Sequence, residues 1–298
     1  MLDRESTFAD PKIISLLTDE FIPVAIDQWY TRRQQDTVGE FYRKIARQGP
    51  RNDFSSTTQG LYIADASGHL ISFNNNRGPE RIRALLETAK AEFKAPQTEV
   101  LISKTTDPKY NPTLPEGAIV VRTSAKVISG YDKTDDHWQH IFQNAVSRDN
   151  LWITGQEQRE LLAQKIPDTL KQRIARFHLV DDTRGEPPTW ESDEIRKLEL
   201  TINDGRISGV VELETKDQTR GYHATLSGIV SGKANKVTEF TLLVEGQFWG
   251  TGHHTMQPPS GKFPLTIAFE LADGTDIADA IAPHASRGWI DGYWDPAR

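Results

Sequence analysis

The fold of the second half of the chain is decided by the stretch Leu198-Glu199-Leu200-Thr201-Ile202-Asn203-Asp204-Gly205-Arg206-Ile207-Ser208. Apolar and polar residues alternate on both sides of Asn203-Asp204-Gly205, a turn sequence that joins two antiparallel strands. Two further β-rich runs follow, Tyr222–Val230 and Val237–Val244, and turn residues 232–235 separate them. The sequence from about residue 195 to 271 therefore predicts an antiparallel sheet or a partly closed barrel.

Helices are expected between residue 118 and this β-rich region. Their predicted ranges are 135–147, 154–165 and 168–178. The second is indicated by Thr154-Gly155-Gln156-Glu157, a capping box in which two side chains each satisfy a free backbone N–H group. Ahead of them, Glu99–Ile102 and Ala118–Arg122 have the composition of strands, and residues 96–117 are rich in proline. We interpret residues 118–298 as an α+β domain and residues 96–117 as a connection.

Residues 1–95 predict a separate α/β domain. Asp10 and Pro11 indicate a helix start, because Asp caps helices well and Pro suits the first helical position. Phe21–Asp27 is apolar enough to predict a buried strand, with Pro23 near its start or on an unpaired side. The remaining expected elements are an amphipathic helix after Asp36, a hairpin of residues 61–64 and 69–73, and a last helix over residues 79–93.

Composition and charge exclude several classes of partner. The 298 residues carry a net charge of -7, from 35 Lys and Arg against 42 Asp and Glu. This is the wrong sign for collecting phosphates, so neither nucleic acid nor a membrane is an expected partner. No window is apolar enough to span a bilayer, and Met1-Leu2-Asp3-Arg4 lacks the pattern of a secretory signal. We expect a soluble cytoplasmic protein, or a periplasmic or secreted one if an upstream signal segment has been lost.

The chain contains no cysteine. Dithiol chemistry, iron–sulfur ligation and thiolate zinc sites are thereby excluded, and His, Asp and Glu are the strong metal ligands that remain. The sequence also has no phosphate-binding glycine loop, no Gly-x-Ser-x-Gly and no His-Glu-x-x-His. No cofactor is therefore expected.

The first 95 residues resemble the thioredoxin-like superfamily, in the branch that includes the spermatogenesis-associated and DsbD-like thioredoxin proteins. The matching residues are Arg4-Glu5-Ser6, Phe8-Ala9-Asp10-Pro11, Leu16-Leu17, Glu20-Phe21-Ile22-Pro23-Val24, Asp27, the hairpin Leu61–Phe73 and the helix Pro79–Phe93. In that family a central strand and a Cys-x-x-Cys pair precede the stretch that aligns with Met1-Leu2-Asp3-Arg4-Glu5. Both are absent here, and Thr57-Thr58-Gln59-Gly60 stands where the family usually has a cis-proline. No catalytic residue can be transferred.

The missing strand has a structural consequence that the resemblance implies. In a thioredoxin sheet it lies between the strands that correspond to Phe21–Asp27 and Leu61–Ala64. Each buried backbone group left without a partner there would cost about 1 to 3 kcal/mol. We therefore expect either a natural start upstream of Met1 or another strand in the slot, with Glu99–Ile102 and Ala118–Arg122 as the local alternatives.

Two histidine pairs are the metal candidates. His137 and His140 are three residues apart, which places both rings on one face of a helix. His253 and His254 lie between glycines and Thr255, which permits a backbone path that aims both rings into one cavity. The simpler interpretation of each pair is an exposed helix start and a surface loop, because no third ligand is apparent.

Other polar residues are expected to be structural. His178 is placed at a helix end, and His223 is placed facing a β core. The run Asp181-Asp182-Thr183-Arg184-Gly185-Glu186 suits a cation or an acid–base pair, although a solvated acidic loop is the simpler interpretation. The tryptophans of the second domain are expected in its core or at the domain interface, with a few able to line a ligand groove: Trp138, Trp152, Trp190, Trp249, Trp289 and Trp294.

Three functional hypotheses follow. The first is a redox-inactive thioredoxin-like protein that acts as a binding or structural module for an unidentified protein or small molecule. The second is a thiol–disulfide oxidoreductase whose Cys-x-x-Cys lies upstream of Met1. The third is a His-dependent metal-binding protein centred on the second domain.

Overall fold

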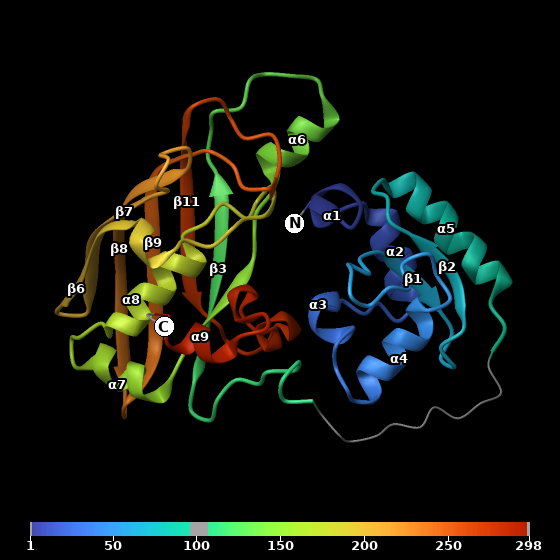
Figure 1. Cartoon of the computed structure of the whole chain (residues 1–298), viewed down its shortest axis with the longest axis horizontal. Helices are drawn as coiled ribbons and strands as arrows, with labels where there is room; N and C mark the ends of the chain where they lie inside the picture. The colour runs from blue at the N-terminus through green and yellow to red at the C-terminus, as the bar shows by residue number, and fades with distance from the viewer. Residues whose placement is uncertain (1, 96–106, 297–298) are drawn as a thin grey trace. The chain divides into compact units, whose positions relative to one another are not determined.

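The computed structural model describes residues 2–95 and 107–296 and divides into two compact units, residues 3–112 and residues 113–298 (Figure 1). Part of the predicted connection therefore falls outside the described residues, and with it the predicted strand Glu99–Ile102. Among the residues that are described, none of the helices has the length and apolar content needed to cross a bilayer.

The N-terminal unit packs helices around one small hairpin. Its elements are α1 (Leu2–Ser6), α2 (Pro11–Glu20), α3 (Gln28–Thr31), α4 (Thr37–Ala46), β1 (Leu61–Ala64), β2 (Leu70–Asn74) and α5 (Pro79–Glu92). The predicted helix start is confirmed, because the Asp10 carboxylate accepts from the N–H groups of Lys12 and Ile13. β1 and β2 pair antiparallel, and Gly68 closes their turn with a φ of 83°. Apolar side chains from α2, α5 and β1 form the core of this unit.

The predicted buried strand Phe21–Asp27 is wrong. These residues belong to no strand, and the described part of the N-terminal unit has β1 and β2 as its sheet. Ile22 is 91% exposed, Val24 73% and Ile26 44%. A run of apolar residues favours a buried strand. A strand forms only where a neighbouring strand provides hydrogen-bond partners for its main-chain N–H and C=O groups.

The C-terminal unit is built on an antiparallel sheet of seven strands in the order β4-β3-β11-β9-β8-β7-β6. The strands are β3 (Ile119–Val127), β4 (Asp149–Ile153), β6 (Ile195–Asn203), β7 (Arg206–Glu214), β8 (Gly221–Lys233), β9 (Lys236–Trp249) and β11 (Lys262–Leu271). The predicted antiparallel sheet is confirmed. β4 and β6 do not pair within the described residues, so the sheet does not close into a barrel.

Local turn chemistry fixes the register of the long hairpins. Asn203 pairs with Arg206 across Asp204 and Gly205, which both have positive φ, and Lys233 pairs with Lys236 across a second such turn. Two-residue turns of this kind match the twist of antiparallel strands. The predicted strand Ala118–Arg122 forms the start of β3, which pairs with β4 and β11. It is therefore not the strand that completes the N-terminal unit.

Helices cover one face of this sheet (Figure 1). They are α7 (Gly155–Leu162), α8 (Asp168–Arg173), the π-helix η1 (Ile174–His178) and α9 (Ile290–Trp294). α6 (His137–Asn144) packs in a separate small apolar cluster, and short 3₁₀ turns lie at Ser192–Glu194, Ile277–Ala280 and His284–Ser286. The predicted capping box of α7 is present in full. Trp152 and Trp190 are buried in the core as predicted, whereas Trp138 and Trp289 are exposed. A two-stranded ladder of β5 (Gly185–Glu186) and β10 (His254–Thr255) lies outside the main sheet.

Candidate functional site

A chain of three polar side chains crosses the layer between the sheet and the helices. Asp149 opens β4, His178 ends the π-helix, and Tyr293 lies on α9. The Nδ1 atom of His178 is 3.3 Å from Oδ2 of Asp149, and its Nε2 atom is 3.2 Å from the hydroxyl of Tyr293. That hydroxyl also accepts a hydrogen bond from the N–H of Trp152. A carboxylate, an imidazole and a phenol from three separate elements are thus held in line.

Burial gives this chain its electrostatic character. The side chain of His178 is fully buried, whereas that of Asp149 is 14% exposed. Burial acts to raise the pKa of Asp149, but the imidazole of His178 and the N–H of His284 outweigh it, so this pKa lies below its ordinary value. Asp149 is therefore a carboxylate at neutral pH.

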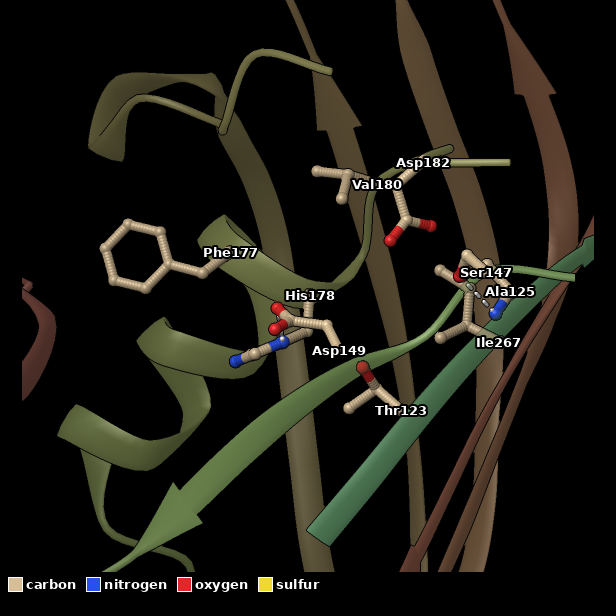
Figure 2. A pocket seen from close by; sticks show the side chains of 9 residues that line it. All are labelled: Thr123, Ala125, Ser147, Asp149, Phe177, His178, Val180, Asp182 and Ile267. Atoms are coloured by element: carbon tan, nitrogen blue, oxygen red, sulfur yellow. Dashed lines mark hydrogen bonds and ion pairs between the residues drawn. The ribbon is translucent and has the colours of Figure 1, made fainter. Parts of the chain in front are cut away.

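A small cavity lies against these residues (Figure 2). Its volume is about 10 Å³, and it is lined by Thr123, Ala125, Ser147, Asp149, Phe177, His178, Val180, Asp182 and Ile267. Ser147 is fixed at its rim, because its hydroxyl accepts from the N–H of Ala125 and its own N–H donates to the carbonyl of Ala125. Space of this size holds one water-sized group and no organic substrate.

Asp182 is the second carboxyl group at the cavity. Burial raises its pKa to about 7, the negative charges of Asp149 and Asp181 act in the same direction, and a hydrogen bond with Ser147 opposes them. At neutral pH the cavity therefore has one ionised carboxylate, Asp149, and one carboxyl close to its titration midpoint. Two carboxyls with pKa values displaced in opposite directions form the arrangement used for general acid and base catalysis. Here the enclosed space admits no substrate, so the pair is suited to holding a proton.

The predicted solvated acidic loop is wrong in its first half. Asp181 and Arg184 are each 1% exposed, and the guanidinium donates to Oδ2 of Asp181 from Nε at 2.8 Å and from Nη2 at 2.6 Å. Thr183 also donates to the Asp181 carboxylate. Burial of these charges is permitted because each has its partner within three residues.

The end of that loop joins a second polar cluster at the surface. Glu186 on β5 pairs with His254 on β10, and its carboxylate contacts His284 at 2.9 Å and Arg287 at 2.5 Å. The hydrogen bond from His284, with the charges of Arg287 and His254, lowers the pKa of Glu186 to about 2. The structure thus brings together His254 and Glu186, which the sequence singled out separately. His253 packs its ring 4.5 Å from that of His254.

The four histidines proposed as metal ligands stay in two separate places. His137 and His140 are exposed on α6, and His253 and His254 are exposed on the loop that carries β10. Within residues 2–95 and 107–296, no group of three or more His, Cys, Asp or Glu side chains is arranged to hold a metal ion.

Two other sequence assignments have clear outcomes. His223 does not face the β core, since its side chain is 42% exposed on β8, within 4.9 Å of the Trp249 ring. Trp249 borders an open hollow of about 440 Å³, but Lys262 Nζ lies 4.0 Å from the centre of its ring. One face of this ring is therefore covered by a cation.

Sequence reasoning missed most of the buried site. Asp149, Ser147 and Tyr293 carry no motif, and they lie 29, 31 and 115 residues from His178 in the chain. The nearest local signal was Asp149-Asn150 ahead of the apolar run Leu151-Trp152-Ile153, which marks the start of a buried strand.

Comparison of the chain with models of protein families, with curated proteins and with solved structures finds no match in any of the three.

Proposed function

We propose that this protein is a non-enzymatic binding protein, whose N-terminal unit is a redox-inactive thioredoxin-like module that binds an extended strand of a partner polypeptide. The observation that carries the proposal is the exposed segment of residues 22–26, whose main-chain groups make no hydrogen bond to another described residue. A chain without cysteine has no thiolate nucleophile, so a thioredoxin-like scaffold here serves binding and not redox chemistry.

Residues 22–26 have features that suit pairing with a strand from another polypeptide. Ile22, Val24 and Ile26 are alternate residues, so their side chains would share one side when the segment pairs as a strand. No main-chain group of residues 22–26 makes a hydrogen bond to another described residue. Pro23, which has no N–H group, belongs to the other set of alternate positions. Pairing through the main-chain groups of Ile22, Val24 and Ile26 would therefore lose no donor.

β1 has one edge whose main-chain groups pair with no described strand, and it packs on the same apolar cluster. Within the described residues it pairs with β2 alone, and Ile63 on β1 packs in one apolar cluster with Phe21. The resemblance implies that a strand belongs between these two segments. A partner strand with alternating apolar residues would gain main-chain hydrogen bonds and bury side chains that are now in water, each worth roughly 1.5–3 kcal/mol when fully covered.

A labelled peptide tests this proposal directly. The probe is a nine-residue peptide of alternating valine and threonine with a lysine at each end, and its binding to the full chain is followed by fluorescence anisotropy. We expect binding by the wild type and at least about a tenfold loss in Val24→Lys, because a charge on the edge opposes strand pairing. The matched control is Val38→Lys, since Val38 is also an exposed valine of the same unit, 60% exposed on α4.

Two results would refute it. One is a wild-type chain that does not bind the peptide, and the other is equal affinity of Val24→Lys and Val38→Lys. Because Val24 is 73% exposed, its replacement removes little core packing, and circular dichroism of both variants checks that they fold alike.

The same open edge favours one other candidate function, a thiol–disulfide oxidoreductase with a strand and a Cys-x-x-Cys encoded upstream of Met1. In the family that the N-terminal unit resembles, the strand before that motif occupies this slot. DNA upstream of the Met1 codon distinguishes the two candidates. An in-frame apolar strand followed by Cys-x-x-Cys supports the oxidoreductase, and nearby in-frame stop codons exclude it.

A further inference from the structure

The cavity in the C-terminal unit collects polar groups from four separate segments (Figure 2). Thr123 comes from β3, Ser147 and Asp149 from the entry to β4, His178 from the π-helix, and Asp182 from the loop before β5. A volume of about 10 Å³ matches one water molecule, and a buried water needs two to four polar partners. Size and chemistry therefore agree on the same occupant.

One buried atom of the cavity lacks a hydrogen-bond partner. Nδ1 of His178 is buried and has Asp149 Oδ2 at 3.3 Å, but no described residue gives it an aligned hydrogen bond. Buried polar atoms are nearly always satisfied by protein or by an ordered water, because leaving one unpaired costs free energy. This observation is independent of the cavity volume, and it concerns a residue that lines the cavity.

We propose that the cavity is a binding site for a single water molecule, which joins the carboxyl groups of Asp182 and Asp149 and the Nδ1 atom of His178 into one proton-sharing site. Below neutral pH, Asp182 holds the proton as a neutral carboxyl. Above it, the proton leaves, and the water donates to both carboxylates. On deprotonation the O–H bond of the Asp182 carboxyl breaks and a solvent water accepts the proton, which is possible because Asp182 is partly exposed.

The charged groups around Asp182 explain why its pKa is raised. Asp149 on β4 is a carboxylate whose own partners are His178 and His284. Asp181 in the same loop is neutralised by Arg184, which also lies near Tyr131. Asp182 makes no ion pair with a described residue, and Tyr293 lies on the far side of the imidazole. An uncompensated buried carboxyl beside a carboxylate keeps its proton, and its pKa is about 7.

Two measurements on the full chain test the site. A crystal structure at a resolution that shows waters is expected to place one density peak in the cavity, within hydrogen-bond distance of Asp182 and Asp149. Nitrogen NMR of the His178 imidazole is expected to show a chemical-shift step near pH 7, which disappears in Asp182→Asn and persists in Asp132→Asn, a change at an exposed aspartate of the same unit.

The crystal structure and the NMR titration can each support or overturn the proposed water site. A water peak together with loss of the step in Asp182→Asn supports the proposal. A cavity without a peak overturns it, and so does a step near pH 7 that survives in Asp182→Asn. The crystal structure uses the wild-type chain, so the proposal stays testable even if the variant does not fold.

Discussion

Replacement of Asp182 by asparagine should change how stability depends on pH. The folded-state pKa of Asp182 is about 7 against an ordinary value of 3.8, so the folded protein binds a proton more tightly than the unfolded chain between these values. The stabilisation from this group is complete below about pH 4 and is lost as the pH rises through about 7. Asparagine has nearly the same shape and no charge, so the variant should lack this loss.

The magnitude follows from the width of that interval. A difference of roughly three pKa units corresponds to about 4 kcal/mol, at about 1.4 kcal/mol per unit. This is an upper bound, because the residue is partly exposed and solvent screens part of the interaction. Wild type and Asp182→Asn should therefore be similar at pH 4.5, and the variant should be more stable by up to about 4 kcal/mol at pH 8.5.

Urea unfolding at several pH values measures the effect. Fluorescence of the buried Trp152 and Trp190 reports the C-terminal unit, and the difference between variant and wild type removes contributions common to both, including the opposite trend from Asp149. Asp132→Asn is the control and should show no pH-dependent difference. If Asp182→Asn and wild type lose stability in parallel across this range, the assignment of a high pKa to Asp182 is refuted.

Three further predictions concern other parts of the molecule. Arg173→Met should lower the free energy of unfolding by about 3–5 kcal/mol, because it leaves the buried Glu157 carboxylate without its partner at 2.7 Å, whereas Arg159→Met on the exposed side of α7 should change it little. Gly221→Val should destabilise the sheet, seen as a lower melting temperature, since an added Cβ would lie 2.1 Å from the Trp249 ring; unchanged melting would contradict the packing described here. The purified chain should reduce no insulin disulfides, and turnover that persists after removal of contaminating thioredoxin would contradict the absence of thiol chemistry.

Some elements were predictable because consecutive residues encode them. The capping box at Thr154 and Glu157 formed as expected, and so did the hairpin across Asp204 and Gly205. In each case the interacting groups lie within a few residues, so the local backbone decides the outcome whatever surrounds it. The alternating pattern of β6 and β7 likewise predicted strands, because one face of each is buried against the core.

The tertiary structure alone decided the rest. Phe21–Asp27 has the composition of a buried strand, yet residues 22–26 are exposed, because strand formation depends on a neighbour that its own residues do not supply. Asp181 and Arg184 look like surface charges, yet they are buried as a pair. The Asp149–His178–Tyr293 chain joins residues up to 144 positions apart. The raised pKa of Asp182 arises from burial, from its sequence neighbour Asp181 and from Asp149, which only folding brings near. Burial and long-range electrostatics are properties of the packed whole, and no window of sequence contains them.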